Sequence, residues 1–186
     1  MIPQRIVPTR HGDARGWFTE SYNRRRLAEQ GIDVDFVQDN HSFSARKGTL
    51  RGLHFQVPPE PQAKLVRCLA GAIWDVAVDV RAGSPTYGQW VAAELTAAGG
   101  EQLFVPVGFA HGFVTLTDNA EVAYKASGYY APACDAGIAW DDPDIAIAWP
   151  LAGIEPQLSD KDRKLPRLAD FASPFAYDGT PLQPLD

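Results

Sequence analysis

Short runs of β-forming residues recur along most of this chain, and glycine or proline separates most of them. The runs that predict strands are residues 17–22, 34–37, 49–56, 64–69, 73–80, 89–95, 102–105, 112–116 and 121–127. The 16 glycines and 15 prolines are spread throughout as turn residues. Such close spacing leaves little room for the helical crossovers of a parallel sheet. We therefore predict an all-β fold, an antiparallel jelly-roll barrel or sandwich with a few short helices.

Local signals add detail to this outline. Asn23 can cap a short helix at residues 24–30, and Gly31 can end it. Gly71 and Ala72 lie between two predicted strands and indicate a tight hairpin. Alternation along 73–80 places Trp74, Val76, Val78 and Val80 on one face and Asp75, Ala77 and Asp79 on the other. From about residue 158 the pattern predicts a short helix and a surface strap.

Composition indicates the class of protein. A chain of 186 residues without internal repeats suits one domain, which we expect to span residues 1–186. No apolar stretch approaches the ~20 residues that cross a bilayer, and the N-terminus does not resemble a signal peptide. The net charge of −6 argues against a nucleic-acid partner. Cys68 and Cys134 are too few for a disulfide framework, so we expect a cytoplasmic protein.

Two of the four histidines stand in patterns that suggest chemistry. In the segment LRGLHFQ, residues 50–56, strand alternation puts Gly52, His54 and Gln56 on one face. Arg51 points to the opposite face unless the strand bends at Gly52, which glycine allows. In PVGFAHGF, residues 106–113, a proline and glycine turn delivers His111 to the start of a strand.

The motif Pro-x-Gly-x-x-His that ends at His111 is the second half of the cupin signature. The first half would supply His54, position 56 and Glu60 as further metal ligands. Position 56 is glutamine, whose neutral amide binds transition metals weakly, and position 115 is threonine where the signature has asparagine. Half of a metal site is left, which weakens the prediction of a metal site but leaves it open at this point.

Further motifs, in order along the chain, resemble one family. They are DARGWF at 13–18, FVQDNHS at 36–42, LRGLHFQ at 50–56, KLVRC at 64–68, DVAVD at 75–79, GFAHGF at 108–113, YK at 124–125, WDDP at 140–143 and LSDKD at 158–162. This ordered set resembles the dTDP-4-dehydrorhamnose 3,5-epimerases. The resemblance implies a metal-free jelly roll that works as a homodimer on a dTDP-sugar, without a cofactor, in dTDP-L-rhamnose biosynthesis.

Epimerisation beside a 4-keto group needs a base, an acid on the opposite face and positive charge near the carbonyl oxygen. By resemblance, His54 is the base, Asp162 orients it, Lys64 stabilises the enolate and Tyr124 is the acid. His111 is expected to donate near the 4-keto oxygen. Asp135 stands where the family usually has glutamate. The residues that resemblance implies in substrate binding are Arg15, Phe18, Glu20, Gln38, Asp39, Asn40, Arg51, His111, Tyr130, Asp135 and Lys161.

Three other functions are compatible with this pattern. A relative could epimerise a single carbon of a dTDP-4-keto-6-deoxy sugar. A metal-dependent cupin isomerase or oxygenase would use His54 and His111 as ligands. A sugar-nucleotide-binding barrel without activity would not need a base, its carboxylate, an acid and a lysine together, so we expect the double epimerase.

Overall fold

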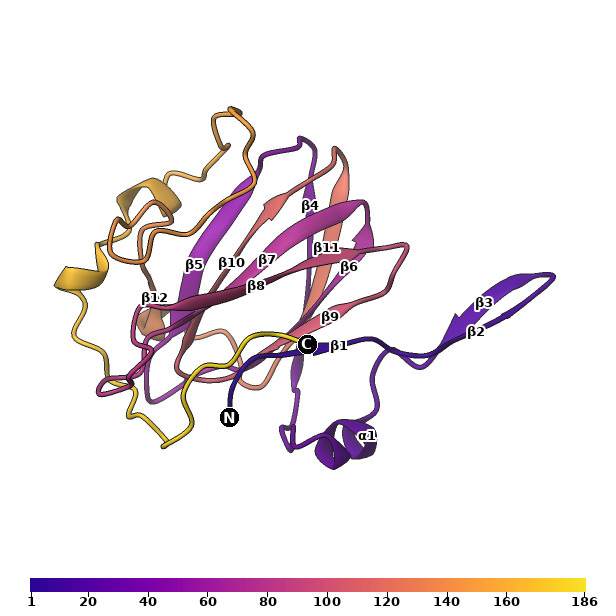
Figure 1. The fold of residues 1–186 in the computed structure, drawn as a ribbon, viewed down its shortest axis with the longest axis horizontal. Helices are drawn as coiled ribbons and strands as arrows, with labels where there is room; N and C mark the ends of the chain where they lie inside the picture. The colour runs from indigo at the N-terminus through magenta and orange to yellow at the C-terminus, as the bar shows by residue number, and fades with distance from the viewer.

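Two five-stranded antiparallel sheets face each other in the computed structural model, which describes all 186 residues (Figure 1). The first sheet has the order β1 (Gln4–Ile6), β9 (Gln102–Val105), β6 (Lys64–Ala70), β11 (Ala120–Ala126) and β4 (Gln38–Ser44). The second has the order β12 (Asp135–Gly137), β5 (Leu50–Gln56), β10 (Phe109–Thr115), β7 (Ala72–Asp79) and β8 (Trp90–Thr96). This arrangement confirms the predicted all-β jelly roll.

Apolar side chains fill the space between the sheets and cover their outer faces. The largest cluster joins residues of both sheets, among them Val66 and Phe113. A second cluster packs the C-terminal segment against the second sheet, through Phe175 for example. The outward-facing valines of β7 belong to this second cluster, whereas Ile73 and Ala77 face the interior. Both faces of β7 are therefore buried, and Asp75 on the inner face has no exposed surface.

The predicted short helix is present, and it covers part of the first sheet. Helix α1 (Arg24–Glu29) is capped by Asn23, whose Oδ1 accepts a hydrogen bond from Arg25 N at 3.0 Å. Gly31 follows it with a φ of +85°, a conformation that suits glycine. Leu27 of this helix packs with Phe104 of β9 in a third cluster.

Two sequence predictions were wrong. Residues 34–37 are not a strand, because Val34 and Phe36 pack beside α1 while the strand begins only at Gln38. Gly71 does not form a hairpin: β6 pairs with β9 and β11, and β7 pairs with β8 and β10. At Gly71 the chain passes from the first sheet to the second. Which strand β7 pairs with depends on residues far away in the sequence, and local turn residues do not reveal it.

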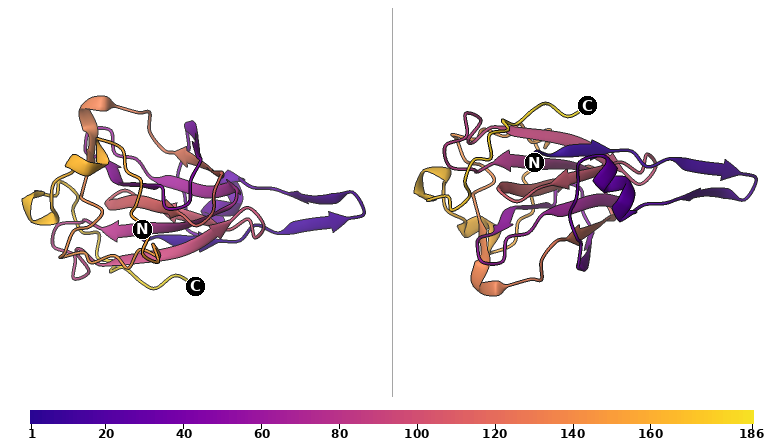
Figure 2. Two further views of the ribbon diagram at one scale, coloured as in Figure 1. Left: turned by 90° about the horizontal axis from the view of Figure 1, so that it is seen from above. Right: turned by 90° about the horizontal axis from the view of Figure 1, so that it is seen from below.

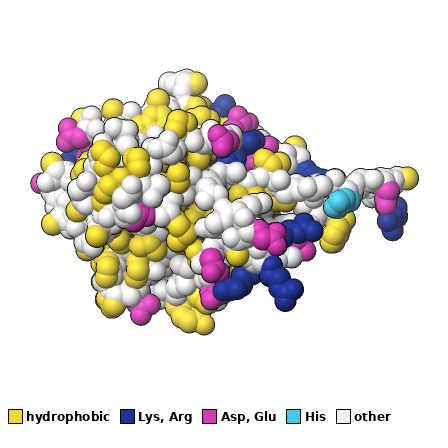
Figure 3. Space-filling model, turned by 60° about the horizontal axis from the view of Figure 1, so that its bottom comes forward, with side chains coloured by type: hydrophobic (Ala, Val, Ile, Leu, Met, Phe, Trp, Pro, Cys, Tyr) yellow, Lys and Arg dark blue, Asp and Glu magenta, His cyan; other side chains and the backbone are white.

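A two-stranded arm stands clear of the barrel, as Figures 2 and 3 show. It consists of β2 (Arg10–Asp13) and β3 (Gly16–Thr19), so the strand predicted at 17–22 ends earlier than expected. Trp17 and Phe18 on this arm are 59% and 71% exposed. An isolated hairpin with exposed aromatic residues has little packing of its own.

Beyond β12 the chain has no further strand. One short 3₁₀ helix, Pro132–Cys134, comes just before β12. Two more lie beyond it at Asp162–Lys164 and Leu168–Asp170, and the rest of the tail runs over the second sheet. This agrees with the predicted short helix and strap. No helix in the structure has the length and apolar character to cross a membrane.

Candidate active site

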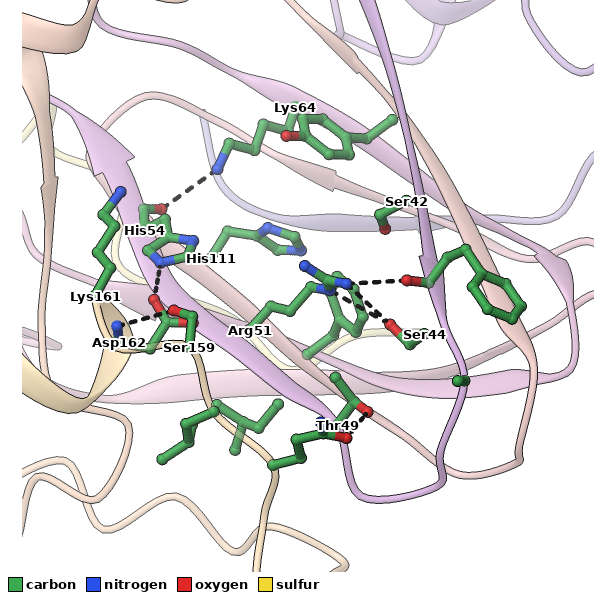
Figure 4. Close-up of a pocket in the computed structure, with 17 residues that line it drawn as sticks. Ser42, Ser44, Thr49, Arg51, His54, Lys64, His111, Ser159, Lys161 and Asp162 are labelled. Atoms are coloured by element: carbon green, nitrogen blue, oxygen red, sulfur yellow. Dashed lines mark hydrogen bonds and ion pairs between the residues drawn. The ribbon is translucent and has the colours of Figure 1, made fainter.

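A cavity of about 540 Å³ opens between the two sheets (Figure 4). Its walls come from β4, β5, β6, β10 and β11 and from the C-terminal tail. The lining residues include all four expected catalytic side chains, His54, Lys64, Tyr124 and Asp162, together with Arg51, His111 and Lys161. The fold therefore gathers residues that are more than 100 positions apart in the sequence.

A bulge in β5 turns Arg51 and His54 into the same cavity. His54 pairs with His111 and Arg51 pairs with Phe113, so β5 carries one extra residue between the two positions. Gly52 has a φ of +120°, and a Cβ added there would lie 2.7 Å from Gly112 Cα on β10. The bend that a glycine at position 52 allows is thus present. Only glycine fits here, because β5 passes very close to β10.

The His54 imidazole is held by a carboxylate from the tail. Its Nε2 lies 2.6 Å from Asp162 Oδ1, and Ser159 Oγ accepts a hydrogen bond from Asp162 N at 3.1 Å. Burial alone would raise the pKa of Asp162, but the hydrogen bonds from His54 and from Gly52 N lower it. An ionised carboxylate only accepts hydrogen bonds, so Nε2 carries the proton and Nδ1 keeps a free lone pair.

Lys64 and Tyr124 come from the opposite sheet. Lys64 Nζ donates to the carbonyl oxygen of His54 at 3.4 Å and lies 5.8 Å from the centre of the Tyr124 ring. Burial lowers the pKa of Lys64 from 10.5 to about 8, against the opposing charges of Asp75 and Asp135. Burial also raises the pKa of Tyr124, which keeps this phenol protonated at neutral pH.

His111 forms a second pair with a carboxylate. Its Nε2 lies 2.7 Å from Oδ1 of the fully buried Asp75 on the neighbouring strand β7. Burial lowers the pKa of His111, although Asp75 acts in the opposite direction.

The remaining expected binding residues make the following polar contacts. Arg51 Nη2 donates to Phe43 O at 3.0 Å and so links β5 to β4 across the two sheets. Lys161 forms an ion pair with Asp135, which also accepts a hydrogen bond from the Tyr130 hydroxyl at 3.2 Å. Gln38 Oε1 accepts from Tyr130 N at 3.0 Å, and Gln38 Nε2 donates to Asn40 at 3.0 Å. Contacts among Gln38, Asn40, Tyr130, Asp135 and Lys161 thus form one connected polar network, and Lys161 and Arg51 line the cavity itself.

Four of the expected binding residues lie elsewhere. Arg15 and Phe18 are on the exposed arm, and Glu20 at its base forms an ion pair with Arg26 at 3.2 Å. Asp39 forms an ion pair with Lys125 at 2.9 Å, on the face of β4 that points away from the cavity. A single chain thus does not bring these four side chains to His54.

The structure adds cavity residues that were not expected. Their polar or aromatic members include Ser42, Ser44, Thr49, Phe113, Gln157 and Ser159. Alternation through Gln38, Asn40, Ser42 and Ser44 could have identified the inner face of β4 if that strand had been recognised. Asp75 was placed on one face of the predicted strand but was given no role, because its position on a hydrophobic strand gives no sign of its partner.

The positions of a cupin metal site are used differently here. The Gln56 amide donates to the backbone carbonyls of Glu60 and Tyr129 at 2.6 and 3.2 Å, so it joins two loops. No three His, Cys, Asp or Glu side chains lie close enough together to hold a metal ion.

Known proteins resemble this chain closely in both sequence and fold. The family model for dTDP-4-dehydrorhamnose 3,5-epimerase matches residues 4–170. An enzyme of that name from Salmonella typhimurium is 52% identical over 90% of this chain and 92% of its own. The crystal structure of one from Bacillus anthracis, with TDP and PPi bound, is 50% identical, with a TM-score of 0.85 over 88% of this chain and 92% of that one. A dTDP-6-deoxy-D-glucose-3,5-epimerase from Legionella pneumophila, in complex with dTDP-4-keto-L-rhamnose, is 48% identical, with a TM-score of 0.86 over 90% and 88% of the two chains.

Proposed function

Because the chain belongs to the dTDP-4-dehydrorhamnose 3,5-epimerase family, we propose that the cavity between its sheets is the site of the family's reaction. The protein is an isomerase that converts dTDP-4-dehydro-6-deoxy-D-glucose to dTDP-4-dehydro-L-rhamnose in dTDP-L-rhamnose biosynthesis. The observation that best supports this use of the cavity is the His54–Asp162 pair, which shares it with Lys64 and Tyr124.

In this proposal His54 is the base for both carbons. Its Nδ1 lone pair takes the proton from C5 or C3, and the electron pair of the broken C–H bond moves to the 4-keto oxygen as an enolate. Asp162 stabilises the imidazolium that forms, through the 2.6 Å hydrogen bond to Nε2. The proton on His54 then exchanges with solvent.

Lys64 and Tyr124 complete the step from the opposite wall. The Lys64 ammonium supplies the positive charge for the enolate oxygen, in a buried site where that charge acts strongly. The Tyr124 hydroxyl protonates the carbon on the face away from His54, and the resulting phenolate regains its proton from solvent. The origin of His54 on β5 and Tyr124 on β11 supports this division, because the two strands belong to facing sheets.

Arg51 and the polar network that Lys161 joins are proposed to bind the nucleotide diphosphate part of the substrate. Arg51 and Lys161 carry the positive charge that phosphates require. Gln38, Asn40, Tyr130 and Asp135 offer hydrogen-bonding groups in the network that Lys161 joins.

We further propose that the protein is a homodimer in which each arm serves the other subunit. Arg15 and Phe18 are expected to bind substrate but stand on an arm that projects away from the barrel. An exposed aromatic arm is well suited to reach a second copy of the chain.

Mixed dimers test this arrangement. A His54→Ala chain lacks the base but has an intact arm, and an Arg15→Ala/Phe18→Ala chain has the base but lacks the arm contacts. If arms act between subunits, co-expression should restore up to about a quarter of wild-type activity, because half of the dimers are mixed and hold one complete site. Activity no greater than the sum of the two parent variants would contradict the proposal.

Proton exchange tests the proposed site. The 4-keto substrate incubated with the protein in D2O should gain deuterium at both C3 and C5, as seen by NMR. His54→Ala should abolish both exchanges, since one base serves both carbons. Deuterium at a single carbon would favour a single-site epimerase, and exchange that persists in His54→Ala would show that another group is the base.

Two broader expectations remain part of the proposal. Residues 1–186 are proposed to act as one epimerase domain. A cytoplasmic location is supported by the two free cysteines, both buried, which need no oxidising compartment.

A further inference from the structure

The His111–Asp75 pair lies deeper than the proposed base. The His111 side chain is 7% exposed and that of His54 is 29% exposed, while Asp75 is completely buried. His111 Nε2 is 2.7 Å from Asp75 Oδ1, a short distance typical of a charge-assisted hydrogen bond. The mechanism proposed above does not use this pair.

Asp75 makes one side-chain hydrogen bond, and that bond goes to His111. Its second oxygen, Oδ2, is buried without any hydrogen-bond partner. A buried polar atom left without a partner is costly, so stability alone does not favour a carboxylate at this position. The presence of Asp75 is better explained by its effect on His111.

This hydrogen bond determines what His111 can offer to a ligand. An ionised carboxylate only accepts, so His111 Nε2 must carry the ring proton. His111 lines the cavity, and its other nitrogen, Nδ1, has no hydrogen-bond partner in the protein. In a neutral ring Nδ1 is then an acceptor and cannot donate to a carbonyl oxygen.

We propose that Asp75 is a positioning residue that holds neutral His111 in its Nε2–H form, so that Nδ1 accepts a hydrogen bond from a hydroxyl of the bound sugar. This inference rests on the proposed function, because the sugar is the substrate assigned to this cavity. It leaves Lys64 as the group that faces the 4-keto oxygen. It also differs from the expectation, based on resemblance, that His111 donates there.

The charges around His111 support a neutral ring. The groups that face it are Asp75 on β7, Lys64 on β6 and His54 on β5. Burial lowers the pKa of His111 below 6.5, and the charges of Lys64 and His54 lower it further. Asp75 raises the pKa, but the net shift of His111 is still downward. The ring is therefore mostly neutral at pH 7 and above.

NMR of ¹⁵N-histidine-labelled protein tests the tautomer directly, in the free enzyme and without substrate. At pH 7.5 the His111 signals should show a protonated Nε2 and an unprotonated Nδ1. The Asp75→Asn variant should shift the tautomer equilibrium of His111, and the matched Asp162→Asn variant should do so only for His54. A protonated Nδ1 in the wild-type protein would overturn the proposal, even if the proposed function holds.

Kinetics then tests the link to the substrate. Asp75→Asn should raise KM about tenfold and change kcat less, since one hydrogen bond to a bound hydroxyl is lost. In a His111→Asn background the same change should have no further effect on kcat/KM. Full additivity of the two losses would mean that Asp75 acts through another group, such as Lys64, and would refute its role as the partner of His111. If Asp75→Asn does not fold, the tautomer in the wild-type protein still decides the question.

Discussion

Replacing Lys64 by methionine should stabilise the fold while it removes activity. The ammonium of Lys64 is buried, its only hydrogen bond is a 3.4 Å contact with a backbone carbonyl, and no carboxylate forms an ion pair with it. Its pKa falls from 10.5 to about 8 for this reason. A tenfold change in a protonation equilibrium corresponds to about 1.4 kcal/mol, so the charged side chain lowers the free energy of unfolding by about 3 kcal/mol at pH 7.

The pH dependence of this penalty has a definite sign. Between pH 8 and 10.5 the unfolded chain keeps the Lys64 proton and the folded chain loses it, so the folded state gains stability as the pH rises. Lys64→Met should therefore be more stable than wild type by about 3 kcal/mol at pH 7 and by less than about 1 kcal/mol at pH 10. Methionine fits because it is unbranched and of similar length to the lysine stem.

Urea denaturation of both proteins at the two pH values measures these differences. Lys47→Met, at an exposed position, is the matched control and should change stability by less than about 0.5 kcal/mol. Activity of Lys64→Met should fall by about 10²–10³-fold, as for other lost groups that stabilise an oxyanion. A variant no more stable than wild type at pH 7, or an advantage that is equal at both pH values, would refute the reasoning.

Three other changes test different parts of the site. In Tyr124→Phe, exchange of substrate protons in D2O should persist while the yield of inverted product falls sharply; equal loss of both would mean that Tyr124 is not the acid. Gly52→Ala should destabilise the fold by about 3 kcal/mol in urea denaturation, because its Cβ would lie 2.7 Å from the backbone of Gly112. Gly16→Ala, at a similar φ of +126° but in open space, is the control and should lower the free energy of unfolding by only about 1 kcal/mol. Equal losses of stability in the two variants would exclude the close approach of Gly52 to Gly112 as the cause. Prolonged EDTA treatment should leave activity unchanged; about one equivalent of bound metal per chain, with activity lost on its removal and regained on its return, would instead favour a metal-dependent cupin.

Local hydrophobic patterns predicted most of the strands. They failed for the strand β4, which consists mostly of polar residues. Residues 50–56 and 64–69 alternate or are strongly apolar, and both are strands. The strand Gln38–Ser44 has only one apolar residue, Phe43, so its register with β11 could not be inferred from hydrophobicity. The false hairpin at Gly71 has a related cause, because turn residues do not specify which sheet the next strand joins.

The candidate site shows the same division. His54 could be predicted as a cavity residue from the sequence, because the alternation and the motif around it are local. Gly52 in the sequence showed that a bend toward the cavity was possible for Arg51. The bulge of β5 against β10, which only the folded structure reveals, produces that bend.

The sequence by itself determined the fold class and the family and predicted candidate residues for the chemistry, since these depend on composition, periodicity and motif. Tertiary structure alone decided the partners of those residues. The Asp162 carboxylate reaches His54 across 108 positions of sequence, and Asp75 reaches His111 across 36. The arm carries Arg15 and Phe18 away from their own cavity. Protonation state, tautomer and charge depend on distances of a few ångströms, and only the folded chain sets such distances.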